Sequence, residues 1–211
     1  MKIELKNIKI RDVVNGYKDS GESGVVGYGG KLNIRPAFQR EFIYGQKERD
    51  AVIRTVRSGF PLNTIYCSDD GYGNFELMYG QQRTISICQY VTEIIPIKFD
   101  DGYELAFNNL TADQQQKILD YELSIYICEG TESEKLAWFR TINIAGKPLT
   151  DQELLNAMHT GPWLADAKRW FSKTGGPAYQ IGENYVNGSP IRRIIWKRHL
   201  IGFRTEKLKT T

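Results

Sequence analysis

Apolar residues recur at every second position in several short segments of the chain. In YELSIYICE (121–129) they alternate with polar or half-polar neighbours, which is typical of a strand with one buried face. Residues 1–10 show a similar pattern and predict a strand that is followed by a helical turn at 11–14. The segments TIYCS and NFELMY flank the turn residues DDGYG, so residues 64–79 predict a β-hairpin.

Elsewhere the spacing of apolar residues is that of one helical face. QKERDAVIRTVRSG places Val52, Ile53 and Val56 on one face, and Gly59 is expected to end that helix. GQQRTISICQYV predicts a second helix directly after the hairpin. Ile85 and Cys88 are expected to face the interior from this second helix.

Capping residues mark the remaining predicted helices. Thr111 is the expected N-cap of LTADQQQKIL, and Thr131 with Glu134 forms a capping box before LAWFRTIN. Two further helices are predicted in TDQELLNAM and WLADAKRWF. A second hairpin is expected across the DDG that begins at residue 100.

The segment 15–31 contains six glycines and predicts either a mobile loop or a plain linker. LNIRPAFQREFIY follows as a short strand and an irregular stretch fixed by Pro36. The first half of the chain therefore mixes strands and helices, whereas the second half is helical. This order predicts an α+β fold with a helical C-terminal extension.

The composition is that of a globular protein, with 211 residues, 41% hydrophobic and 25% charged. A chain of this length is expected to form one domain, or one domain plus a short appendage. No run of about 18 apolar residues occurs, so no membrane span is expected. The three scattered cysteines are expected to be reduced thiols, which favours a cytoplasmic location. With only two histidines, a histidine-based zinc site is not expected.

The positive net charge comes from the last twenty residues. Residues 192–211 hold seven basic residues and one acid, so removing them from the 28 basic and 25 acidic residues leaves 21 and 24. The body of the chain is therefore acidic and the tail basic. A basic tail usually indicates nucleic acid as a partner.

The strongest candidate for a binding site is the junction between the hairpin and the helix after it. The first turn of a helix combines backbone N–H groups with the positive end of the helix dipole, and this geometry binds phosphate. Gly80 lets the backbone approach a ligand, and Arg83 can fork onto a phosphate oxygen. Gln81 and Gln82 suit a base, a sugar or a water, and Thr84 adds a hydroxyl. The alternative is an ordinary strand–turn–helix with a surface arginine.

Two weaker clusters accompany this junction. Arg35, Gln39 and Arg40 surround the bend at Pro36 and could form a second anion clamp or be solvated side chains. Asn143 ends a predicted helix and could face a pocket or pack at a helix junction. The chain contains no GxxxxGK[ST] and no GxSxG, so a P-loop and an α/β-hydrolase elbow are excluded.

Taken in order, RPAFQREFIY, FPLNTIY, MYGQQRTIS and WFRTINIAGKPLTDQELLNA resemble the N-terminal domain of GmrSD-type restriction proteins, from about residue 20 to 191. The resemblance implies a ParB/sulfiredoxin-like core at 1–130, a helical extension at 131–191, and binding of a nucleoside triphosphate with Mg²⁺. It also implies NTP hydrolysis and, in full-length members, an HNH-type nuclease domain that cuts DNA, which is not expected in this chain. By this resemblance Gly80, Gln81, Gln82 and Arg83 line the nucleotide site, and Gln39 and Arg40 belong to the adjoining motif. The clusters described above add Arg35, Thr84 and Asn143 as candidate nucleotide-binding residues.

Two positions depart from the family pattern. The aspartate of the family's DGQQR signature is Tyr79 here, so nucleotide binding is expected to survive better than hydrolysis. The tail 192–211 does not continue the family sequence, and one hypothesis is that it is frameshifted; the alternative is a native basic helix. The rival to a nucleotide-binding sensor is a non-enzymatic module for DNA or a partner on the same scaffold.

Overall fold

The computed structural model describes residues 1–20, 24–36, 44–98 and 103–144, together with three single positions at 166, 170 and 177. The chain divides into two compact units, Met1–Leu149 and Thr150–Thr211. The fold below is that of the first unit. The predicted boundaries at 130 and 191 stay predictions. The helix expected in TDQELLNAM and the tail lie outside the described residues, and so does the helix expected in WLADAKRWF except for the single positions 166 and 170.

A seven-stranded mixed sheet forms the centre of the first unit, with strand order β1-β9-β5-β6-β4-β3-β2. The strands are β1 (Lys2–Lys9), β2 (Lys18–Asp19), β3 (Val25–Gly27), β4 (Leu32–Asn33), β5 (Ile65–Asp69), β6 (Phe75–Tyr79) and β9 (Glu122–Glu129). The pairs β5–β9 and β4–β6 are parallel, and the other neighbours are antiparallel. A separate ribbon pairs β7 (Ile97–Lys98) with β8 (Glu104–Leu105). Both predicted hairpins are therefore confirmed.

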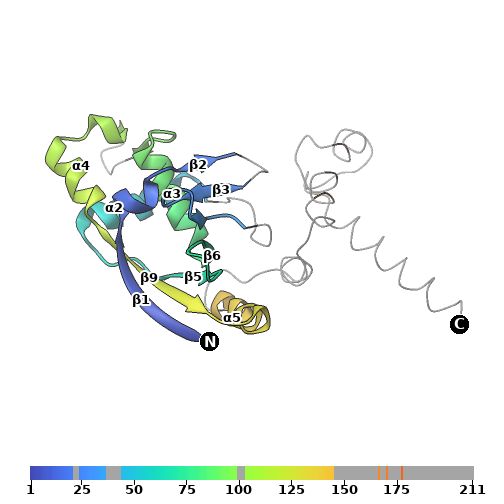
Figure 1. Ribbon diagram of the computed structural model, residues 1–211. Helices are drawn as coiled ribbons and strands as arrows, with labels where there is room; N and C mark the ends of the chain where they lie inside the picture. The colour runs from blue at the N-terminus through green and yellow to red at the C-terminus, as the bar shows by residue number, and fades with distance from the viewer. Residues whose placement is uncertain are drawn as a thin grey trace, which may run out of the picture. The chain divides into compact units, whose positions relative to one another are not determined.

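The helices are α1 (Ile10–Val14), α2 (Gln46–Ser58), α3 (Gln81–Val91), α4 (Ala112–Leu119) and α5 (Glu132–Ile144), with a 3-10 turn at Phe107–Asn109. Sheet and helices together confirm the predicted α+β class. In Figure 1 α1 to α4 gather away from α5, which lies near the ends of β5, β6 and β9.

The two faces of the sheet are covered by different helices. Cys67 of β5 belongs to the main core with Ile53 of α2 and Ile85 of α3. The next residue back, Tyr66, contacts Trp138 of α5 with ring centroids 6.0 Å apart. Successive strand residues point to opposite faces. α2 and α3 therefore cover one face, which we call the inner face, and α5 covers part of the other, the outer face.

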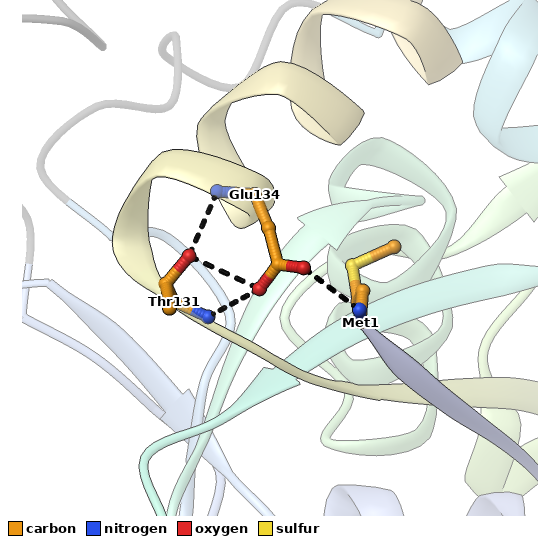
Figure 2. A network of polar contacts seen from close by, with 3 residues as sticks. All are labelled: Met1, Thr131 and Glu134. Carbon is orange, nitrogen blue, oxygen red and sulfur yellow. Dashed lines mark hydrogen bonds and ion pairs between the residues drawn. The ribbon is translucent and has the colours of Figure 1, made fainter.

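The predicted helix ends are correct where their geometry is described. Gly59 ends α2 with φ of 73°, and its N–H bonds back to the last turn. Thr111 and Gln114 cap α4 reciprocally. Thr131 and Glu134 do the same for α5, and the Met1 ammonium bonds to Glu134 at 2.9 Å (Figure 2). Each of these helix ends could be predicted from the sequence because it depends on a local pattern of residues.

The prediction of a loop for residues 15–31 is wrong for much of its described part. β2 and β3 pair there, and the Tyr28 N–H donates to the Val13 carbonyl at 2.8 Å. Gly27 is needed for this close packing, since a Cβ at that position would lie 2.6 Å from the same carbonyl oxygen. The glycines thus bring a ribbon of backbone against α1.

Candidate functional site

The junction between β6 and α3 has the geometry expected from the sequence. β6 ends at Tyr79, and Gly80 takes φ of 105° as the residue before α3. A Cβ on Gly80 would lie 2.9 Å from Cγ1 of Ile65, so a side chain there is opposed by both space and backbone conformation. The hydrogen-bond ladder of α3 begins with the Thr84 N–H, which donates to the Gly80 carbonyl at 3.0 Å. The positive end of the α3 dipole therefore lies at this turn.

The two glutamines are buried, with exposed fractions of 4% for Gln81 and 7% for Gln82. Oε1 of Gln82 accepts a hydrogen bond from the Tyr44 N–H at 3.1 Å. Tyr44 directly follows residues 37–43, which carry Gln39 and Arg40 and lie outside the described residues. The start of α3 is therefore fastened to the end of the segment that holds the second predicted motif.

Arg83 points to a different side of α3. Its Nη2 donates to the Thr64 carbonyl at 3.0 Å, and its Cζ lies 5.1 Å from the centroid of the Tyr79 ring. Its Nε is covered and has no hydrogen-bond partner among the described residues. The guanidinium is thus held against the ends of β5 and β6, rather than beside Tyr44.

Thr84 is occupied within its own helix. Its hydroxyl donates to the Gly80 carbonyl at 3.1 Å, and the residue is 1% exposed. In this conformation the hydroxyl does not face solvent. Asn143 lies in the last turn of α5, and its side chain is outside what the structure describes.

Arg35 lies near the other end of α3. It acts electrostatically on Tyr17, whose pKa is raised by burial first, then by Cys88 and Asp19, against an opposing effect of Arg35. Gln89 lies beside the same tyrosine. Gln82 and Gln89 are seven positions apart, or about 10 Å along the helix. Arg35 and Arg83 are therefore not brought together at one point.

Sequence reasoning missed the polar face of α3 that joins these two ends. Gln82, Ser86 and Gln89 are all buried, at 7%, 3% and 9% exposure. Their spacing of four and three residues puts them on one helical face. Gln89 faces the Tyr17 hydroxyl, and this side-chain contact lowers the pKa of Tyr17 against the larger effect of burial. The spacing of Gln82, Ser86 and Gln89 in the sequence was the available signal.

α2 runs alongside this polar face. Tyr44, just before α2, bonds to Gln82, and Arg57 near its end opposes the burial that raises the pKa of Tyr90 to about 12. The two helices therefore run in the same direction. Asp50, in the second turn of α2, is buried at 7% exposure, and its Oδ1 has no hydrogen-bond partner in the described part of the chain. Unsatisfied buried polar atoms are uncommon and need an explanation such as a ligand.

Two other features of the described residues bear on chemistry. An apolar pocket lined by Ile8, Tyr28, Phe75 and Ile127, among others, includes none of the predicted site residues. In residues 1–20, 24–36, 44–98 and 103–144, no three histidine, cysteine or acidic side chains come together as metal ligands.

A comparison with protein families decides the affiliation of this chain. The family model described as "GmrSD restriction endonuclease, N-terminal domain" matches residues 11–160, which is more than half of the 211 residues. The chain belongs to this family. The match includes the β6–α3 junction and the segment around Pro36, so both belong to the GmrSD N-terminal domain. No curated protein and no solved structure matches the chain.

The membership connects this GmrSD-type domain with DNA restriction and phage defence. In the part of the chain that the structure describes, no helix combines the length and the apolar character needed to cross a bilayer.

Proposed function

We propose that this chain is the nucleotide-binding sensor domain of a GmrSD-type restriction protein, on a ParB/sulfiredoxin-like scaffold. The ligand is a nucleoside triphosphate with Mg²⁺, and it lies along α3. Its phosphates interact with the first turn of α3 and with Arg83. The domain works in the cytoplasm, where foreign DNA is encountered.

The bond from Tyr44 N–H to Gln82 Oε1 carries this proposal. Tyr44, the last residue of RPAFQREFIY, thereby contacts the helix that begins with GQQR about forty residues later in the sequence, and both motifs contain glutamine and arginine. Glutamine amides and guanidinium groups are the side chains that read bases and phosphates. The orphaned Oδ1 of Asp50 on α2 is further support, since a bound ligand would satisfy it.

The residues fit a triphosphate better than they fit a bare cation. Arg83 and the α3 dipole supply positive potential for phosphate oxygens. Mg²⁺ commonly binds through substrate phosphates and few protein carboxylates, so the ion would arrive with the nucleotide and neutralise part of its charge. Tyr79 offers no carboxylate at the start of α3, which favours binding over hydrolysis. Hydrolysis, if any, is therefore expected to be slow.

Calorimetric titration with each of the four NTPs and Mg²⁺ tests the proposal. We expect one or more NTPs to bind and to raise the unfolding temperature, because a ligand that binds only the folded state adds about 2.7 kcal/mol at 100 times its Kd. Arg83→Ala should weaken this binding. Lys2→Ala is the matched control, since Lys2 pairs with Glu129 at the opposite end of the sheet and should leave affinity unchanged.

Absence of heat and of thermal stabilisation with all four NTPs would remove the proposal. If the chain instead bound duplex DNA with an affinity that fell steeply with salt and did not respond to NTPs, the rival of a DNA-binding module would replace it.

A further inference from the structure

The Arg83 guanidinium is held on three sides at the start of α3. Nη2 donates to the Thr64 carbonyl at 3.0 Å, and the centroid of the Tyr79 ring lies 5.1 Å from Cζ. Gly80 provides room on the third side, because a Cβ there would be 3.3 Å from Nη2. The position of this side chain therefore depends on a carbonyl, a ring and the absence of a Cβ.

None of these contacts cancels the positive charge of Arg83. A carbonyl oxygen and an aromatic ring attract a guanidinium without carrying a formal negative charge. Within the described residues no carboxylate pairs with Arg83, and its Nε lacks an acceptor. These contacts therefore leave the positive charge of the guanidinium without a counter-ion among the described residues.

The Tyr79 ring is itself fixed by neighbouring rings. Tyr66 lies opposite Tyr79 on β6 and opposite Tyr126 on β9 in the strand register. Its centroid is 6.1 Å from that of Tyr79 in an edge-on arrangement and 5.3 Å from that of Tyr126 in a stacked one. Trp138 of α5 closes over Tyr66. A row of rings across the outer face therefore limits how Tyr79 can turn.

We propose that Tyr79 is a positioning residue for Arg83. Its ring holds the guanidinium at the start of α3 without neutralising the positive charge, so that the guanidinium can bind an anionic phosphate oxygen. The inference rests on the proposed function for the identity of the anion. A carboxylate at position 79 would pair with Arg83 and compete with the ligand, whereas the Tyr79 ring orients the guanidinium and leaves its charge available.

The test compares Tyr79→Phe, which keeps the ring, with Tyr79→Leu, which removes it. The readout is the Kd for the tightest-binding of the four NTPs with Mg²⁺, measured well below the unfolding temperature. We expect Tyr79→Phe to stay within about twofold of wild type and Tyr79→Leu to bind roughly 3- to 30-fold more weakly, the range expected from a cation–π contact. Tyr72→Leu is the matched control, because Tyr72 is 90% exposed at the tip of the β5–β6 hairpin.

A second measurement separates this inference from the proposed function. In a double-mutant cycle of unfolding with Tyr79→Leu and Arg83→Ala, the two changes should be less than additive, because each removes the same contact. Tight NTP binding by Tyr79→Leu, or weak binding by Tyr79→Phe, would overturn the positioning role and leave the proposed function standing. If wild type binds no NTP, the proposed function fails, and the cycle then decides: coupling supports the positioning of Arg83, and additivity overturns it.

Discussion

At the scale of single residues, the start of α3 depends on Gly80 more than on any polar side chain. Its φ of 105° is a conformation that L-residues rarely adopt, and its missing Cβ leaves space for Ile65 and for the Arg83 guanidinium. The candidate site therefore requires a residue without a Cβ and with a positive φ at position 80. A side chain at this position would displace the group that the phosphate is expected to meet.

Gly80→Ala should destabilise the fold by about 1–3 kcal/mol through backbone strain, with an added cost from the contact with Ile65. Gly71→Ala is a matched control, because Gly71 also has positive φ, at 82°, but a Cβ there would meet nothing within 4 Å. Chemical unfolding of both variants gives the comparison. Equal losses would mean that the contact with Ile65 and Arg83 contributes nothing.

The sequence predicted the role of a single residue only where that role depends on its neighbours along the chain. The turn at Gly80 follows from a strand, a glycine and a helix in sequence order. That Arg83 faces Thr64 and Tyr79, whereas Gln82 faces Tyr44, depends on how α3 is rotated over the sheet. Tyr17 and Asp50 come from distant segments and carry no motif, so only the fold could place them beside α3.

At the scale of elements, the helix starts are fixed by reciprocal side-chain bonds. Thr131 and Glu134 cap α5, and the Glu134 carboxylate also accepts a hydrogen bond from the Met1 ammonium (Figure 2). The pKa of Glu134 is lowered to about 2, first by the bond from the N-terminal amine and then by the bonds from Thr131. The alternation that predicts β9 and the caps that predict α4 and α5 are short-range signals. The glycine-rich ribbon was missed because its pairing with α1 is a tertiary contact.

The lowered pKa of Glu134 predicts how stability depends on acid. Its folded pKa of about 2 lies below the ordinary glutamate pKa of 4.5, so its contribution to stability is complete above pH 4.5 and is lost as pH falls toward 2. Glu134→Gln should remove this part of the acid sensitivity, measured as unfolding temperature against pH. Glu122→Gln, an exposed carboxylate on β9, is the control. Parallel pH profiles for Glu134→Gln and wild type would contradict the assignment.

At the scale of the whole first unit, one core joins the sheet to α1, α2, α3 and α4. The three cysteines, Cys67, Cys88 and Cys128, are free thiols inside this unit, as the sequence predicted. Burial raises the pKa of each, so the reactive thiolate form is suppressed in the folded state. They are therefore expected to respond to opening of the core as a whole.

A thiol reagent should label none of the three cysteines under native conditions and all three in denaturant. The labelling rate measures how often the core opens. A nucleotide that binds along α3 should slow the labelling of Cys88 in particular, because Cys88 lies on that helix. Rapid labelling of a cysteine in native buffer would indicate local opening of its element.

The bond between Met1 and Glu134 has a practical consequence for anyone who produces the protein. A tag or cloning scar fused ahead of Met1 would turn the ammonium into a neutral amide and leave the carboxylate without its cation. The first turn of α5 would then lack the ion pair between the Met1 ammonium and Glu134 in every measurement on that protein. A label placed at the other terminus leaves this bond intact, so acid-stability measurements should use that design.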